Sequence, residues 1–425
     1  KDESFNAAAE GEEAKWETKK VPNVVNNTNP AWVRKPGDLS DEDYKEFYRE
    51  LYPMSFDEPL FNIHLNVDFP FNLTGVLYFP KIKPNVEPQR NKIQLFQKQV
   101  FVTDSVEGIV PDFLTLLHGV IDSPDIPLNV SRSYLQADGN VKKISSHITK
   151  KVADKLDEMF RKDREDFEAK WNDMKIIIEY GMLTEDKFFD KAKKFALYED
   201  TEGKLHTFDA YLKLIKKNQT DKDKKTVVLY ASHKDGQHSY VEAAKSKGYH
   251  VLLLDSPLTS HLIQKLEGEF SDTTFARVDS DLIDNLIKKD ETRVAKLSDK
   301  QKEELKNRLE SIVPKEKFTL KLEDMDSTEA PLIITVPEFM RRMKEMQMTG
   351  GGGMMGMSDF PEMYDLVVNA NHSLASKILD TEDEGARSSA VNQALDLAKL
   401  QQNLLHGEEL TAFIARSYEM LEENK

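Results

Sequence analysis

Two short apolar runs constrain the fold of this chain more than any other feature. They cover residues 226–232 (TVVLYAS) and 250–256 (HVLLLDS), and polar turns bound each of them. Helical patterns follow at residues 239–247 and 258–266. Strands that alternate with helices pair in parallel, because each helix carries the chain back across the sheet, nearly always with a right-handed connection. The alternation therefore predicts a small parallel sheet with helices on its faces.

The length of the chain requires further domains around this sheet, since 425 residues exceed what one hydrophobic core normally serves. The predicted fold class is multidomain, α/β followed by α+β, with two α/β subdomains joined by helices. In order, we predict a tether over residues 1–37, a large α/β subdomain over 38–150, a helical connector over 151–204, a small α/β subdomain over 205–288, and an α+β domain over 289–425 that ends in a helical bundle.

The large subdomain begins with a helix that Ser40 caps, and strand-like runs follow at residues 62–69, 73–79 and 92–102. Residues 111–121 (PDFLTLLHGVI) have the apolar spacing of a further helix. We therefore expect a sheet followed by a helix in this part of the chain.

Composition excludes several classes of function. The net charge of −16, from 59 basic and 75 acidic residues, argues against a nucleic-acid-binding protein, because such proteins neutralise phosphates with clustered Lys and Arg. No run reaches the roughly 18 to 20 apolar residues of a membrane span. The chain has no cysteine, which excludes disulfides and thiolate metal sites and is compatible with the cytoplasm. His233 and His238 lack a spaced carboxylate cluster, so we predict no metal site.

Residues 126–136 (IPLNVSRSYLQ) could carry phosphate chemistry through Arg132. The guanidinium group is planar and permanently charged, which suits bidentate contact with a phosphate. The alternative is an ordinary surface arginine paired with a carboxylate, and such pairs far outnumber phosphate contacts. From the pattern alone, an ordinary surface arginine is the favoured interpretation.

Several segments, which follow one another along the sequence, help to decide between a phosphate contact and a surface ion pair for Arg132. Residues 128–132 (LNVSR), followed by Leu135 and Gln136, resemble the middle-domain signature of the heat-shock protein 90 family. Other segments that resemble the family in order are residues 41–48 (DEDYKEFY), 57–60 (DEPL), 75–80 (GVLYFP), 100–104 (VFVTD) and 381–384 (TEDE). The resemblance runs from about residue 38 to residue 425, and it is strongest to the short bacterial form.

The resemblance implies an ATP-dependent chaperone for partly unfolded client proteins. It implies that Arg132 reaches the γ-phosphate of ATP held with Mg by an N-terminal domain, and that Gln136 helps to position that domain. The sequence departs from the family at Ser133 and Tyr134. We find no motif of the N-terminal ATP site, so we expect this chain alone to bind no cofactor tightly and to lack ATPase activity.

A methionine-rich stretch is the candidate client contact. Phe339, Met340, Met343 and Met346 share one helical face. Methionine is flexible and polarisable, which suits varied apolar partners, although the same stripe could pack in a core or at a dimer interface. The resemblance favours client contact. Phe56 is a weaker candidate, and a core position is at least as compatible with its sequence context.

The last two helical segments bury poorly on their own and are typical of half a bundle. Their apolar positions are Val391, Leu395 and Ala398 in the first helix, and Leu410, Phe413, Ile414 and Leu421 in the second. They could pack on their own chain, but the resemblance implies a homodimer through them. The sequence ends without a Met-Glu-Glu-Val-Asp tail, so we expect no tetratricopeptide cochaperone to bind there.

Two other functions remain open from the residues. A doubly wound enzyme would place its site at the carboxyl ends of the two apolar runs, near Ser232 or Asp255. A constitutive dimeric scaffold would use the terminal helices without any client work.

Overall fold

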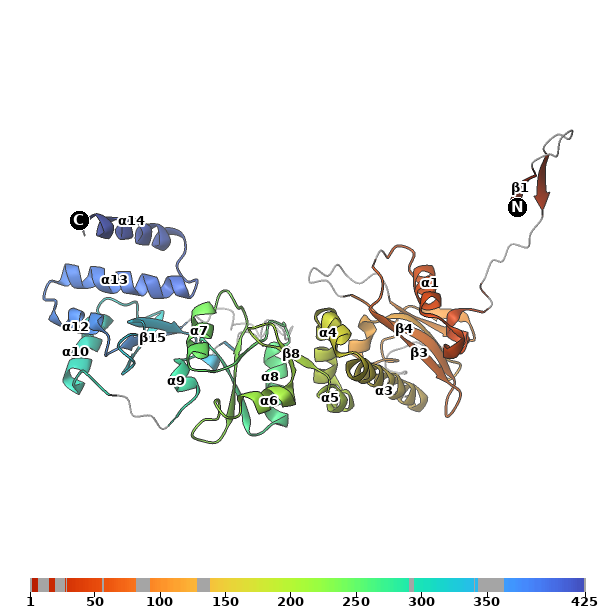
Figure 1. Cartoon of the computed structure of the whole chain (residues 1–425), viewed down its shortest axis with the longest axis horizontal. Coiled ribbons are helices and arrows are strands. Elements are labelled where there is room, and N and C mark those ends of the chain that lie inside the picture. The colour runs from red at the N-terminus through yellow and green to blue at the C-terminus, as the bar shows by residue number, and fades with distance from the viewer. Residues whose placement is uncertain are drawn as a thin grey trace. The chain divides into compact units, whose positions relative to one another are not determined.

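The computed structural model describes residues 2–6, 15–19, 27, 29–55, 57–81, 92–127, 138–289, 294–339, 341–342 and 363–423 (Figure 1). The chain divides into two compact units, residues 1–152 and 153–425. None of the helices described is both long and apolar enough to cross a membrane.

A five-stranded mixed sheet forms the centre of the first unit. Its strands, in spatial order, are β3 (Phe61–Val67), β4 (Leu73–Phe79), β7 (His118–Asp122), β5 (Ile93–Gln97) and β6 (Val100–Thr103). All neighbours are antiparallel except β5 and β7, which are parallel. The sheet therefore places β7, the last of these strands in sequence, in its middle.

Aromatic side chains fill the space between this sheet and α1 (Asp41–Leu51). The helix begins at Ser40 with a capping box and buries Tyr44, Phe47 and Tyr48. The buried hydroxyls are paired: Tyr78 donates to the Tyr44 carbonyl at 2.7 Å, and the Tyr48 hydroxyl lies 2.9 Å from His118 Nδ1. All residues of this aromatic core belong to the first unit.

The helix that we predicted over residues 111–121 is wrong. The chain forms a short 3-10 helix, Asp112–Leu116, and then enters the central strand β7. Val120 and Ile121 are apolar because a central strand is buried on both faces, a pattern that helical spacing can imitate over so few residues. Gly119 has φ +130°, and a Cβ there would lie 2.0 Å from the Val76 carbonyl oxygen. This position therefore requires glycine.

The tether predicted over residues 1–37 also includes folded residues. The strands β1 (Asp2–Asn6) and β2 (Lys15–Lys19) pair antiparallel. Trp32, in the 3-10 helix Ala31–Val33, packs in the aromatic core and donates its indole hydrogen to Asp122 at 3.2 Å. The folded part of the first unit therefore begins before residue 38.

Helices lead from the first unit into the second. They are α3 (Gly139–Lys162), α4 (Arg164–Thr184) and α5 (Asp186–Ala192), and a short hairpin of β8 (Leu197–Glu199) and β9 (Leu205–Thr207) follows. The predicted helical pattern of this region is confirmed.

The predicted parallel sheet is also confirmed. It has the order β11 (Val251–Leu253), β10 (Thr226–Ala231), β12 (Thr273–Arg277), and both pairings are parallel. The helices of this region are α6 (Phe208–Ile215), α7 (His238–Ser246), α8 (Thr259–Glu269) and α9 (Ile283–Leu286). The sequence analysis missed β12, because its alternating polar residues give no continuous apolar run.

The last part of the second unit is α+β, as predicted. Its three-stranded sheet has the order β13 (Phe318–Glu323), β15 (Tyr364–Asn369), β14 (Leu332–Thr335). The helices are α10 (Asp299–Glu310), α12 (Ser373–Asp380), α13 (Glu384–Gln401) and α14 (Gly407–Glu423). Leu305, Leu366 and Val391 belong to its core.

One junction joins this part to the parallel sheet's helices. The Tyr240 hydroxyl of α7 donates to the Ile334 carbonyl of β14 at 2.7 Å. Gln402, which ends α13, donates to the same carbonyl at 2.8 Å and to the Tyr240 hydroxyl at 2.5 Å. The α7 helix, the β14 strand and the end of α13 therefore meet at one point.

Candidate functional site

Phe339 is the member of the predicted client-contact set that the structure describes. It lies in a helical stretch just after β14, and 71% of its surface is exposed. This phenylalanine is little buried by its own chain, so its ring is open to contact with another molecule.

Charged residues lie beneath the same stretch. Glu338 Oε1 accepts three hydrogen bonds: from the Tyr230 hydroxyl at 3.1 Å, from Arg341 at 2.5 Å and from Arg342 at 2.7 Å. Burial would raise the pKa of Glu338, but the nearby charges of Arg341 and Arg342 outweigh it and hold the pKa below its ordinary value. Glu338 is therefore a carboxylate at neutral pH.

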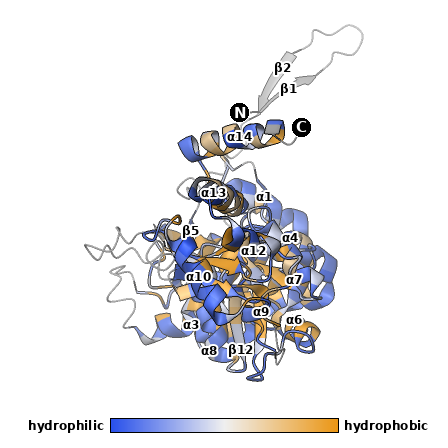
Figure 2. Cartoon of the chain, turned by 90° about the vertical axis from the view of Figure 1, so that its left-hand side faces the viewer, coloured by the Kyte–Doolittle hydropathy of each residue, from blue (hydrophilic) through white to orange (hydrophobic). Residues whose placement is uncertain are grey.

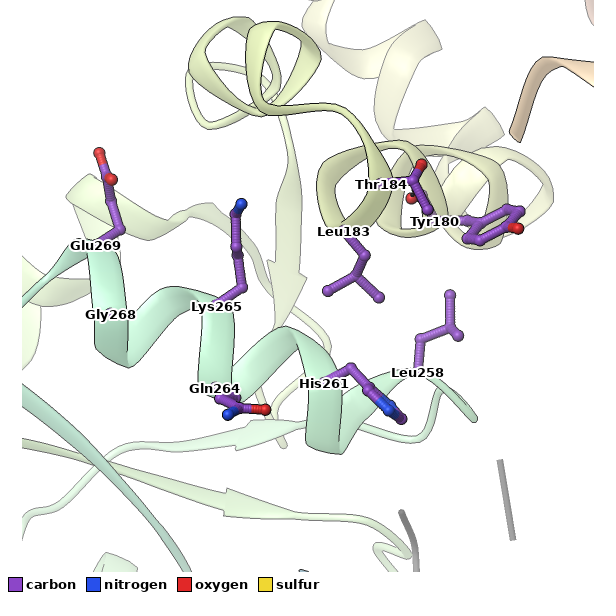
Figure 3. Close-up of a pocket in the computed structure, with 9 residues that line it drawn as sticks. All are labelled: Tyr180, Leu183, Thr184, Leu258, His261, Gln264, Lys265, Gly268 and Glu269. Atoms are coloured by element: carbon purple, nitrogen blue, oxygen red, sulfur yellow. Dashed lines mark hydrogen bonds between the residues drawn. The ribbon is translucent and has the colours of Figure 1, made fainter. Parts of the chain in front are cut away.

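A groove of about 660 Å³ lies between α4 and α8 (Figure 3). Leu183 and Leu258 reach into it from the two helices. Of the charged residues on its rim, Lys265 pairs with Asp186 at 2.6 Å and Glu269 pairs with Lys193 at 2.8 Å. The groove thus combines apolar side chains with paired charges on its rim.

The terminal helices carry a second exposed apolar surface. In α14, Ile414, Tyr418 and Leu421 are 45%, 65% and 68% exposed, and they recur at helical spacing. Figure 2 shows hydrophobic and hydrophilic segments alternating along α14. Leu397 and Leu400 of α13 are exposed as well. We call the three α14 residues the α14 stripe.

Charged pairs hold α14 against α13. Asp396 accepts from Arg416 at 2.5 Å and lies 3.3 Å from Lys399. Lys399 also lies 3.3 Å from Glu409 at the start of α14. Polar contacts thus join the two helices on one side, while the α14 stripe stays uncovered.

Several predicted site residues lie outside the described residues. These are Arg132 and Gln136 of the phosphate stretch, and Phe56, Met340, Met343 and Met346 of the client-contact set.

Three residues of the predicted dimer interface are buried within their own chain. Val391, Leu395 and Ala398 are 0%, 2% and 3% exposed and pack in their own chain's core. The burial of these three residues agrees with the alternative of packing on their own chain. Leu410 is partly buried and Phe413 is 9% exposed, whereas Ile414 and Leu421 face outward.

The sequence analysis missed the contacts of Arg341 and Arg342. Arg342 pairs with Glu267 of α8 at 3.0 Å, across 75 positions of sequence. No local pattern signals such a pair, because the fold alone brings the two residues together. The adjacent arginines following Glu338 were the available hint.

The geometry gives the enzyme hypothesis no support. The backbone amides of Ser232 and His233 both donate to the Gln237 side chain, and Asp255 pairs with Lys175. Neither Ser232 nor Asp255 lines the α4–α8 groove. Across the described ranges, no three His, Cys, Asp or Glu side chains form a group that could hold a metal ion.

Comparisons with known proteins decide the family. The model of the Hsp90 protein family matches residues 1–424. The chain belongs to the Hsp90 protein family. Among its Hsp90 relatives, a chaperone protein HtpG of Porphyromonas gingivalis is 53% identical over 93% of this chain and 58% of the relative. One of Bacteroides fragilis is 48% identical over 94% and 68%. One of Myxococcus xanthus is 28% identical over 93% and 60%.

The chain spans roughly three fifths to two thirds of the length of these Hsp90 relatives.

Proposed function

We propose that this chain is the client-binding and dimerising part of an ATP-dependent chaperone that works in the cytoplasm. The identity of about half of its residues to bacterial proteins named chaperone protein HtpG carries the proposal. The exposed Phe339 and the α14 stripe support it, because they are apolar side chains open to contact with another molecule.

The proposed client contact is Phe339 with the methionines that follow it, and Phe56 is a further candidate. Partly unfolded proteins expose apolar side chains of varied shape, and an aromatic ring beside flexible thioethers can accept many of them. The α14 stripe would be covered by the same stripe of a second copy, since a twofold axis pairs identical patches.

The proposed role of Arg132 is contact with the γ-phosphate of ATP, with Mg bound beside it in an N-terminal domain, and Gln136 would help to position that domain. A guanidinium group at this place would neutralise charge that develops as the phosphoryl group leaves. In a fusion of an Hsp90-family ATP-binding domain to residue 1, we expect Arg132→Ala to lower ATP turnover by about 10³-fold while nucleotide binding persists. Unchanged turnover would remove Arg132 from the mechanism.

The client contact is tested with the chain itself. Light scattering follows the aggregation of heat-denatured citrate synthase in the presence of increasing chain concentrations. We expect Phe339→Ser to raise the half-effective concentration at least about threefold, since a central aromatic contact commonly contributes over 1 kcal/mol to binding. The matched control is Leu214→Ser, which removes a 45% exposed apolar residue of α6.

Equal suppression by the parent and both variants would contradict client contact at Phe339. No suppression by the parent at any concentration would leave the constitutive scaffold as the better account.

A further inference from the structure

The charged residues beneath Phe339 connect its helical stretch to the parallel sheet at three places. Arg342 donates to Glu267 of α8 at 3.0 and 3.4 Å and to the Phe275 carbonyl of β12 at 3.0 Å. Arg341 donates to the Tyr230 hydroxyl of β10, and its guanidinium carbon lies 5.5 Å from the centre of that ring. We call Glu267, Glu338, Arg341 and Arg342 the anchor cluster.

The anchor cluster is balanced in charge and largely removed from water. Two arginines face two glutamates, and the Arg341 side chain is 5% exposed while the other three are 24% to 25% exposed. Burying ion pairs costs desolvation energy that well-packed apolar residues would avoid. Unlike an apolar contact, the planar guanidinium group of arginine fixes the orientation of the helical stretch, because its N–H groups must align with their acceptors. The cluster is therefore better explained by orientation than by stability.

The helical positions fix which way Phe339 points. Glu338, Arg341 and Arg342 are spaced i, i+3 and i+4, so they share the face that contacts the sheet. Phe339 lies about 100° round the helix from Glu338, and its 71% exposure agrees with an outward position. A backbone hydrogen bond of 2.9 Å from Val336 to Asp279 holds the approach to this stretch as well.

We propose that the anchor cluster is a positioning device that holds Phe339 outward from the parallel sheet for contact with apolar segments of partly unfolded proteins. The role of the anchor cluster in client contact rests on the function proposed above. Its effect on the orientation of Phe339 is independent of that function. The residues that act are Glu267, through Arg342, and Glu338, through both arginines. None of them touches the client.

Glu267 offers a substitution that isolates the anchor. In Glu267→Gln, the amide oxygen can still accept the 2.8 Å hydrogen bond from the Phe275 amide, but the charge that faces Arg342 is gone. Glu269→Gln is the matched control, because it removes the same charge from the same helix and loosens only the Lys193 pair at the surface. Arg342→Lys is the second variant, since it keeps the charge and gives up the planar guanidinium group.

The first readout is independent of any client. The chain has no cysteine, so Phe339→Cys provides one site for a nitroxide label, whose mobility electron paramagnetic resonance measures. We expect Glu267→Gln and Arg342→Lys to raise the label's mobility, and Glu269→Gln to leave it at the parent value. Equal mobility in all four proteins would overturn the proposal.

The second readout is suppression of citrate synthase aggregation by the unlabelled variants. We expect Glu267→Gln to raise the half-effective concentration by about three- to tenfold, with a melting temperature close to that of Glu269→Gln. Higher mobility with unchanged suppression would overturn the role in client contact. Higher mobility in a chain whose parent suppresses nothing would uphold the anchor and reject the function proposed above.

Discussion

Every side chain of β7 is buried, whereas among the described side chains of α14 only that of Phe413 is. The strand lies between β4 and β5, and the polar residue at each of its ends has a partner: His118 meets Tyr48, and Asp122 accepts from Trp32. The helix keeps an apolar stripe uncovered and is joined to α13 largely by charged pairs. The comparison separates a part that its own chain covers completely from a part that keeps an apolar stripe exposed.

The largest expected effect is in β7. Gly119→Ala places a Cβ 2.0 Å from the Val76 carbonyl oxygen at φ +130°, so we expect a loss of more than about 4 kcal/mol in the stability of the first unit. Hydrogen exchange of the β7 amides measures it. Gly139→Ala is the control, because a Cβ there meets no atom within 4 Å. Similar exchange in both variants would contradict the tight contact between β4 and β7.

The next effect is the pH dependence of the same strand. Burial lowers the pKa of His118 from its ordinary 6.5 to about 4. Between these values the unfolded chain binds a proton that the folded chain does not, so stability falls as pH falls, by up to about 3 kcal/mol. Urea unfolding at pH 7 and pH 4.5 measures the loss, and His118→Gln is expected to reduce it. An equal loss in that variant would place the titrating group elsewhere.

A smaller effect is expected where α13 meets α14. Asp396→Asn removes the carboxylate that Arg416 and Lys399 share, which we expect to weaken the docking of α14 by about 1–2 kcal/mol. Faster hydrogen exchange in α14 with unchanged exchange in the α13 core would show it. Unchanged exchange in α14 would mean that these ion pairs contribute little to the docking of α14 on α13.

The smallest effect on stability is expected in the α14 stripe. Ile414→Ser with Leu421→Ser removes exposed side chains, so the monomer should change by less than about 0.5 kcal/mol. The proposed dimer should nevertheless weaken at least about tenfold, because two central apolar contacts are lost. Sedimentation equilibrium measures the dissociation constant. A large loss of stability without a change in mass would mean that α14 is completed within its own chain.

Sequence patterns predicted the elements whose periodicity is local. The alternation of strands and helices across residues 226–266 predicted the parallel sheet, and the apolar spacing in residues 388–405 and 410–421 predicted two amphipathic helices. The patterns failed where the answer depends on a distant neighbour. Residues 118–122 are a strand because β4 and β5 flank them, and Val391 is buried because its own chain's sheet covers it.

The candidate site divides in the same way. Phe339 was predicted as a client contact from its place beside methionines and from the family resemblance; the structure shows that its side chain is exposed, and its contact with clients stays a prediction. The anchor cluster was not predicted, since Glu267 and Arg342 are ordinary charged residues until α8 and the stretch after β14 are brought together.

The junction of Tyr240, Gln402 and the Ile334 carbonyl has a mechanical consequence. Sliding α13 along its axis must either break the hydrogen bonds of Gln402 or pull β14 with it. β14 leads within a few residues to Glu338, so a force applied at the terminal helices is transmitted to the base of Phe339 through one short strand. A movement of the proposed dimer contact would thus be coupled mechanically to the proposed client contact at Phe339.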